Sequence, residues 1–194
     1  MSVDYRANTK GKAMAMGEKT ALVVDDDEGA LETTKDFLES EGYFVDVATT
    51  VQKAKQKVLD GLNCSVVVTD FNMPGGDGIQ LFSYLREERP DVGVIMMSGY
   101  PDDIGKKYSQ IVVDREGGVL RWGSPDEDGC IEIPILTKPF QPAALVALVR
   151  EIEKRNSSVL SAEGAVLSGD GQRESSRGRR AVTPAGISRL VIGC

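Results

Sequence analysis

The sequence predicts an α/β protein built on a doubly wound parallel sheet, and three observations support this prediction. Short runs rich in β-branched residues alternate along the chain with segments of helical spacing. The runs are nearly continuous in apolar residues, as in strands buried on both faces of a parallel sheet. Several runs end in a polar side chain and continue into turn residues, which is the arrangement at the carboxyl edge of such a sheet.

The first half of the chain supplies two strands, each followed by a helix. Residues 20–24 form an apolar run, and the helix expected at 28–41 carries a stripe of apolar residues and stops at Gly42. Residues 43–48 alternate between apolar and polar side chains, as a second strand does. The Lys-rich segment 51–59 has the spacing of an amphipathic helix.

Three further strands complete the predicted sheet. Residues 66–70 are a valine-rich strand, followed by a helix at 78–88. Residues 92–97 and 133–136 read as buried strands. The last helix, 142–155, has apolar residues at i, i+3, i+4 and i+7, which gives it one face for the core.

One interval does not fit the regular alternation. The stretch between Ser98 and Lys138 is far longer than the dozen or so residues that a crossover between parallel strands needs. It begins with a short helical segment and continues with two β-rich runs, 111–115 and 119–122, which flank a Glu-Gly-Gly turn. We therefore expect a β-hairpin-like insertion at about 110–131, between the fourth and fifth strands.

The rest of the chain divides into one domain and two tails. Residues 1–18 mix small, polar and charged side chains without a period, and we expect a flexible leader. Residues 19–156 form the domain. Residues 157–194 are rich in Ser, Gly and Arg, and we expect a disordered tail without a DNA-binding output domain.

Composition narrows the function classes. The formal net charge of −7 disfavours a nucleic-acid partner, because phosphate backbones bind clustered Lys and Arg. The three cysteines lack metal-type spacing and predict a reducing, cytoplasmic location. No segment is apolar enough to predict a membrane partner. The chain has no histidine, which excludes a histidine base, ligand or phosphohistidine of its own.

Polar side chains stand at the ends of four predicted strands. They are Asp25 with Asp26, then Asp70, Ser98 and Lys138. The carboxyl ends of parallel strands share one edge of the sheet, so we expect these side chains to converge in space. Alone, each would be read as a turn residue, a helix cap or a solvated charge. Their shared position makes them a candidate site.

The chemistry of this cluster favours phosphoryl transfer. Three neighbouring carboxylates repel one another and require cations. Oxygen-only ligands favour Mg²⁺, with Mn²⁺ as an alternative. Asp70 would attack in line, Mg²⁺ and Lys138 would offset the charge on the phosphoryl oxygens, and Ser98 would hydrogen-bond one of them.

The joint pattern resembles the receiver domain of two-component response regulators. The resemblance covers about 19–155 and extends to single-domain, chemotaxis-type receivers and to receivers of hybrid histidine kinases. The motifs that carry it are the acidic pair after the first strand, Asp70 followed by Asn72-Met73-Pro74 and Gly78, Ser98 after the fourth strand, and Lys138-Pro139-Phe140 after the fifth.

The resemblance implies a role for each of these residues. Asp70 would be the phospho-acceptor, and Ser98 and Lys138 would be the phosphate-sensing pair. The Lys138–Pro139 peptide bond is cis in many members of the family. The implied Mg²⁺ ligands are Asp25, Asp26, Asp70 and the backbone carbonyl of Asn72.

The resemblance also implies a fold and partners. The fold would be flavodoxin-like, with a five-stranded parallel sheet in the order 2-1-3-4-5. The phosphoryl group would come from a phosphohistidine on a histidine kinase or a histidine phosphotransfer protein. The aspartyl phosphate would be lost by slow self-dephosphorylation, so the domain would be a signalling module and not a turnover enzyme. Members of the family can also form homodimers.

One departure from the family pattern leaves an alternative open. Family members usually place Tyr or Phe three residues before the lysine, whereas this chain has Ile135. A pseudo-receiver that only binds partners is therefore one alternative. A second is a phosphatase of the haloacid dehalogenase type, because Asp25 and Asp27 have its Asp-x-Asp spacing. In that enzyme Asp70 would lack a role.

Overall fold

The computed structural model describes residues 19–114, 116, 118–122 and 130–166, together with the backbone of residues 6–7 and 13–14. Two short strands, β1 (Arg6–Ala7) and β2 (Ala13–Met14), pair antiparallel within the segment expected to be a flexible leader. The remainder of that leader and the part of the expected tail after residue 166 lie outside the described residues, so both expectations stay predictions.

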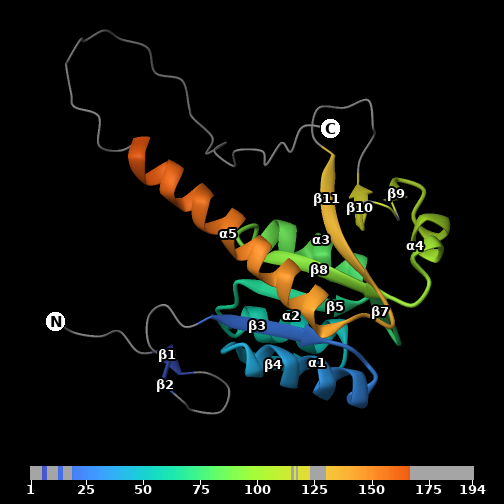
Figure 1. Ribbon diagram of the computed structural model, residues 1–194, viewed down its shortest axis with the longest axis horizontal. Helices are drawn as coiled ribbons and strands as arrows, with labels where there is room; N and C mark the ends of the chain where they lie inside the picture. The colour runs from blue at the N-terminus through green and yellow to red at the C-terminus, as the bar shows by residue number, and fades with distance from the viewer. Residues whose placement is uncertain are drawn as a thin grey trace, which may run out of the picture.

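A seven-stranded sheet forms the centre of the domain, in the order β4-β3-β5-β8-β11-β10-β9 (Figure 1). Its first five strands are parallel and follow the predicted order 2-1-3-4-5, which confirms the predicted fold. They are β3 (Thr20–Val24), β4 (Phe44–Ala48), β5 (Val66–Asp70), β8 (Gly93–Ser98) and β11 (Ile131–Thr137).

Helices cover both faces of the sheet, and each face has its own apolar core. Leu31 and Leu38 of one helix pack with Leu145 and Val149 of another on one face. The second core lies on the opposite face and includes residues of the three remaining helices. The helices are α1 (Glu28–Ser40), α2 (Val51–Leu59), α3 (Gly78–Glu88), α4 (Pro101–Lys107) and α5 (Pro142–Val166).

The predicted insertion is a hairpin that extends the main sheet. Strands β9 (Ile111–Asp114) and β10 (Val119–Trp122) are antiparallel to each other, and β10 pairs antiparallel with β11. The pairing with β10 explains why β11 begins at Ile131, two residues before the expected start. Trp122 packs on Phe82 of α3, with 5.6 Å between ring centroids, so this aromatic residue fixes the hairpin to the domain.

Helix α5 continues beyond its predicted end near residue 155 to Val166. The sequence from 156 to 163 has neither glycine nor proline, so nothing in it stops the helix before Gly164. Within the described residues no helix combines the length and the apolar character needed to cross a membrane.

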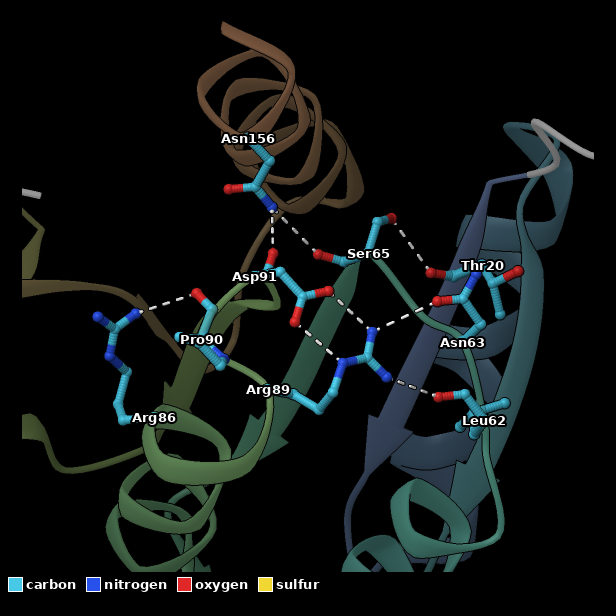
Figure 2. Close-up of polar contacts among 9 residues, drawn as sticks. All are labelled: Thr20, Leu62, Asn63, Ser65, Arg86, Arg89, Pro90, Asp91 and Asn156. Atoms are coloured by element: carbon cyan, nitrogen blue, oxygen red, sulfur yellow. Dashed lines mark hydrogen bonds and ion pairs between the residues drawn. The ribbon is translucent and has the colours of Figure 1, made fainter. Parts of the chain in front are cut away.

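Polar contacts connect the loops at the amino ends of the parallel strands, at the opposite end of the sheet from the predicted site (Figure 2). Arg89, at the end of α3, donates to both carboxylate oxygens of Asp91 at 2.9 Å. It also donates to the carbonyl of Leu62 and the side chain of Asn63 in the loop before β5. Asn156 of α5 donates to the backbone carbonyl of Asp91 at 3.0 Å. Two loops and helix α5 are thus held together by one guanidinium group and one amide group.

We predict that Arg89→Ala lowers the free energy of unfolding by about 2 kcal/mol, because several charge-assisted hydrogen bonds are lost together. Arg86→Ala is the matched control, since Arg86 makes one long contact, 3.4 Å, to the carbonyl of Pro90. The control should change stability by less than about 0.5 kcal/mol. Urea denaturation measures both variants, and equal effects would refute the assigned role of Arg89.

Candidate functional site

The candidate site lies at the carboxyl ends of four parallel strands. Asp25 directly follows β3, Asp70 ends β5, Ser98 ends β8 and Lys138 follows β11. The sheet register aligns these ends, because Asp70 is paired with Met97 and Thr137 is paired with Ser98. The backbone amide of Lys138 donates to the carbonyl of Ser98 at 2.8 Å, which brings the last two strand ends together.

A single ammonium group joins two buried carboxylates at the centre of this edge. Lys138 Nζ lies 2.7 Å from Asp25 Oδ2 and 2.5 Å from Asp70 Oδ1. Asp25 is 1% exposed and Asp70 is 8% exposed. Residues from three distant parts of the sequence therefore meet in one ionic cluster, as the strand-end pattern predicted.

Backbone amides orient the remaining oxygens of the two carboxylates. Asp25 Oδ1 accepts from the amide of Asp27 at 3.0 Å, and Asp70 Oδ2 accepts from the amide of Asn72 at 2.6 Å. Each carboxylate thus binds the Lys138 ammonium group through one oxygen and accepts a hydrogen bond from a backbone amide of its own loop through the other. This arrangement fixes the orientation of both carboxylates.

Electrostatics at the site favour an added cation. Burial raises the pKa of the Asp70 carboxyl above its ordinary value, although hydrogen bonding to Lys138 opposes the shift. Burial by itself would lower the pKa of Lys138, but hydrogen bonds to Asp25 and Asp70 raise it above its ordinary value. With Lys138 charged, two ionised carboxylates leave one negative charge without a buried partner. A divalent cation would more than offset this excess.

The oxygen donors of the site fit Mg²⁺ as a cofactor. Among the described residues, no group of three or more His, Cys, Asp or Glu side chains is already arranged to hold a metal. Mg²⁺ keeps several waters and needs only one or two carboxylates, which the Asp25–Asp70 pair supplies. Asp26 is exposed beside this pair, and the amide of Asn72 bonds Asp70. Their assignment as ligands stays a prediction.

Ser98 is at the predicted place, but its hydroxyl group contacts its own loop. It is 2% exposed, and its Oγ accepts from the backbone amide of Tyr100 at 3.1 Å. Its predicted contact with a phosphoryl group stays a prediction. Tyr100 itself is largely exposed.

Asp27 does not share the site with Asp25. Its side chain is exposed and caps α1, because Asp27 Oδ1 accepts from the amide of Ala30 at 2.9 Å. The Asp-x-Asp pair required by the phosphatase alternative is therefore split between a buried ionic cluster and a helix cap.

Sequence reasoning missed three residues next to the site. Asp77 is buried at the start of α3, and it accepts hydrogen bonds from Lys107 and Tyr108 at the end of α4. The polar residue before Gly78 was a visible signal for a helix cap, but no sequence spacing connects it to Lys107 and Tyr108 at the end of α4.

Comparisons with known proteins agree with this geometry. The family model of the response regulator receiver domain matches residues 21–112. These residues belong to the response regulator receiver domain family. Receiver domains of response regulators are signalling modules, and they generally bind Mg²⁺ at an acidic pocket.

Several curated relatives have related sequences. The response regulator protein FleR of Pseudomonas aeruginosa is 34% identical over 128 residues, 66% of this chain and 23% of FleR. The photosynthetic apparatus regulatory protein RegA of Cereibacter sphaeroides is 29% identical over 83 residues, 43% of this chain and 45% of RegA. This chain thus spans less than half the length of either relative. The transcriptional regulatory protein FixJ of Azorhizobium caulinodans is 29% identical over 178 residues, 89% of this chain and 69% of FixJ.

Solved structures show the same fold. A receiver protein from Sinorhizobium medicae superposes with a TM-score of 0.57 at 24% identity, covering 73% of this chain and 99% of that one. A CheY-like receiver domain from Methanospirillum hungatei gives a TM-score of 0.57 at 25% identity, covering 73% of this chain and 98% of that one.

We predict that Gly78→Ala destabilises the domain, because Gly78 lies against the backbone of Asp70. A methyl group there would lie 2.8 Å from the carbonyl oxygen of Asp70 and 2.3 Å from Met96 Sδ. The expected loss is about 2 kcal/mol in the free energy of unfolding. Gly99→Ala, where a methyl group meets open space, should change it by less than about 0.5 kcal/mol. Urea denaturation that ranks the two variants equally would contradict the close packing at Gly78.

Proposed function

We propose that this domain accepts a phosphoryl group from the phosphohistidine of a partner onto Asp70. The observation that carries the proposal is the buried Asp25–Lys138–Asp70 cluster at the carboxyl edge of the sheet. It combines an oriented nucleophile, a fixed cation and an excess negative charge that a divalent cation would more than offset. The donor would be a histidine kinase or a histidine phosphotransfer protein, since the chain has no histidine.

The transfer needs little covalent chemistry from the protein. An oxygen of the Asp70 carboxylate attacks the phosphorus atom, the bond from phosphorus to the donor's imidazole nitrogen breaks, and the imidazole takes a proton from solvent. The products are an aspartyl phosphate and a neutral histidine. Bound Mg²⁺ would supply positive charge next to the phosphoryl oxygens in this step.

Lys138 supports the product state. In the unphosphorylated domain its ammonium group bonds Asp70 Oδ1. After transfer, the same group would pair with a phosphoryl oxygen, which carries more negative charge than an ester-like carbonyl. Hydrolysis by water then returns Asp70 to a carboxylate, and this slow loss resets the module.

Two features support a signalling module over the alternatives. The phosphatase alternative needs Asp27 in the site, and Asp27 caps α1. The pseudo-receiver alternative rests on Ile135, which is buried in β11. Among the described contacts, no hydrogen bond or ion pair joins Ile135 to Asp25, Asp70 or Lys138. Ile135 therefore bears on how a signal leaves the domain, and the acceptor chemistry does not depend on it.

We predict that the protein gains one phosphoryl group from acetyl phosphate in the presence of Mg²⁺, and that Asp70→Asn abolishes this gain. Intact-mass spectrometry measures the addition of the phosphoryl mass. EDTA should prevent labelling, and Mg²⁺ or Mn²⁺ should restore it. Asp60→Asn is the matched control, because Asp60 is an exposed aspartate at the end of α2 and should label as the wild type does. Equal labelling of the Asp70→Asn variant would overturn the proposal.

A further inference from the structure

Two residues at the end of α4 contact the loop that follows the acceptor aspartate. Lys107 Nζ lies 2.5 Å from Asp77 Oδ2, and the hydroxyl group of Tyr108 donates to the same oxygen at 2.7 Å. The Asp77 side chain is 2% exposed, and its other oxygen caps α3 by accepting from the amide of Gln80. Asp77 is therefore a buried carboxylate that three donors hold in place.

The same two residues also contact the beginning of this loop. Phe71 directly follows Asp70 and is fully buried. The Lys107 ammonium lies 5.6 Å from the centre of the Phe71 ring, and the Tyr108 ring packs edge-on against it at 6.5 Å. Lys107 and Tyr108 thus hold both ends of the segment from Phe71 to Asp77.

This segment carries the groups that would bind the cation. Strands β6 (Asn72–Met73) and β7 (Gly76–Asp77) form a small hairpin in which Asn72 is paired with Asp77. The amide of Asn72 also bonds Asp70 Oδ2. Contacts that hold Asp77 in place therefore also restrain Asn72, whose carbonyl is the proposed ligand. Through the amide of Asn72 they restrain the carboxylate of Asp70 as well.

On their other side, Lys107 and Tyr108 lead directly into the inserted hairpin. The carbonyl of Tyr108 accepts from the amide of Ile111, the first residue of β9, at 2.9 Å. Helix α4 packs closely on β9, since a methyl group on Gly105 would lie 3.4 Å from Val113. The end of α4 and the hairpin β9–β10 thus form one packed unit with contacts to the site.

We propose that Lys107 and Tyr108 are positioning residues that couple the cation- and phosphoryl-binding loop to the α4–hairpin unit. The inference rests on the proposed chemistry at Asp70. It gives this chain a physical connection from Asp70 to the surface of the domain. The connection does not pass through Ile135, which stands where family members usually have Tyr or Phe.

The coupling has two measurable consequences, because linkage between two sites is reciprocal. Loss of the contacts to Asp77 should weaken Mg²⁺ binding, by about five-fold if the coupling is at the low end of the usual range. In return, occupation of the site should reduce the motion of the hairpin. If Lys107 had only a structural role, its replacement would lower the stability of the domain but would not change both the Mg²⁺ affinity and the response of the hairpin to Mg²⁺.

The test compares four variants of the full chain. Lys107→Met and Tyr108→Phe each remove one donor to Asp77. Lys107→Arg keeps the charge and should restore part of the coupling. The matched control is Lys106→Met, because Lys106 is the neighbouring lysine of α4 and pairs with exposed Asp103 at 2.7 Å. Lys107 is half exposed, so its replacement should leave the domain folded even if Tyr108→Phe does not.

Two readouts decide the outcome. Calorimetric titration with Mg²⁺ should give a Kd about five-fold higher for Lys107→Met and Tyr108→Phe than for the wild type and Lys106→Met. Hydrogen exchange of the amides in 111–114 and 119–122 should slow when Mg²⁺ with beryllofluoride, a phosphoryl analogue, is added to the wild type and Lys106→Met. The slowing should be lost in Lys107→Met and Tyr108→Phe.

Equal Mg²⁺ affinities for Lys107→Met and Lys106→Met would overturn the coupling. Hairpin exchange that slows equally in both variants would overturn it as well. Failure of the proposed function can be distinguished from failure of the coupling. If the wild type takes no phosphoryl group from acetyl phosphate, its affinity for Mg²⁺ can still be measured and compared with that of the variants. In that case the Mg²⁺ affinities alone decide the coupling.

Discussion

The site depends on one ammonium group shared between two buried carboxylates. Removing Asp25 and Asp70 from water is costly unless each is paired, and Lys138 supplies one positive charge for both. The three residues come from the ends of three different strands, so the cluster exists only when the parallel sheet has its observed register. The incomplete neutralisation makes the site receptive to a divalent cation.

The inserted hairpin changes the edge of the sheet on which a signal could be read. Strand β11 would be an edge strand in a five-stranded receiver, but here β10 pairs with it along Val119–Trp122. Leu120 and Ile111 of the hairpin are buried in the same core as Phe82 of α3. The hairpin is therefore an integral part of the fold, and the end of α4, which leads into it, contacts Asp77 in the loop that follows Asp70.

The alternation of strands and helices and the convergence of Asp25, Asp70 and Lys138 could be predicted from local periodicity and strand-end positions, whereas the strand order was implied by the resemblance to receiver domains. The sequence also predicted the hairpin, from its turn and β-rich flanks. It could not predict the pairing of β10 with β11 or the contacts of Lys107 with Asp77. Both are tertiary contacts, and such contacts leave no period in the sequence. The end of α5 was misplaced because polar residues after 155 still permit a helix.

The most direct test of the central claim is the effect of Mg²⁺ on the free energy of unfolding of the wild type and Lys138→Met. Without Lys138 the two buried carboxylates repel each other, so the variant should be less stable and should gain more stability from saturating Mg²⁺ than the wild type does. Lys57→Met, which removes a lysine paired with Asp46 away from the site, should respond to Mg²⁺ as the wild type does. An equal Mg²⁺ effect in all three proteins, or none, would contradict the account.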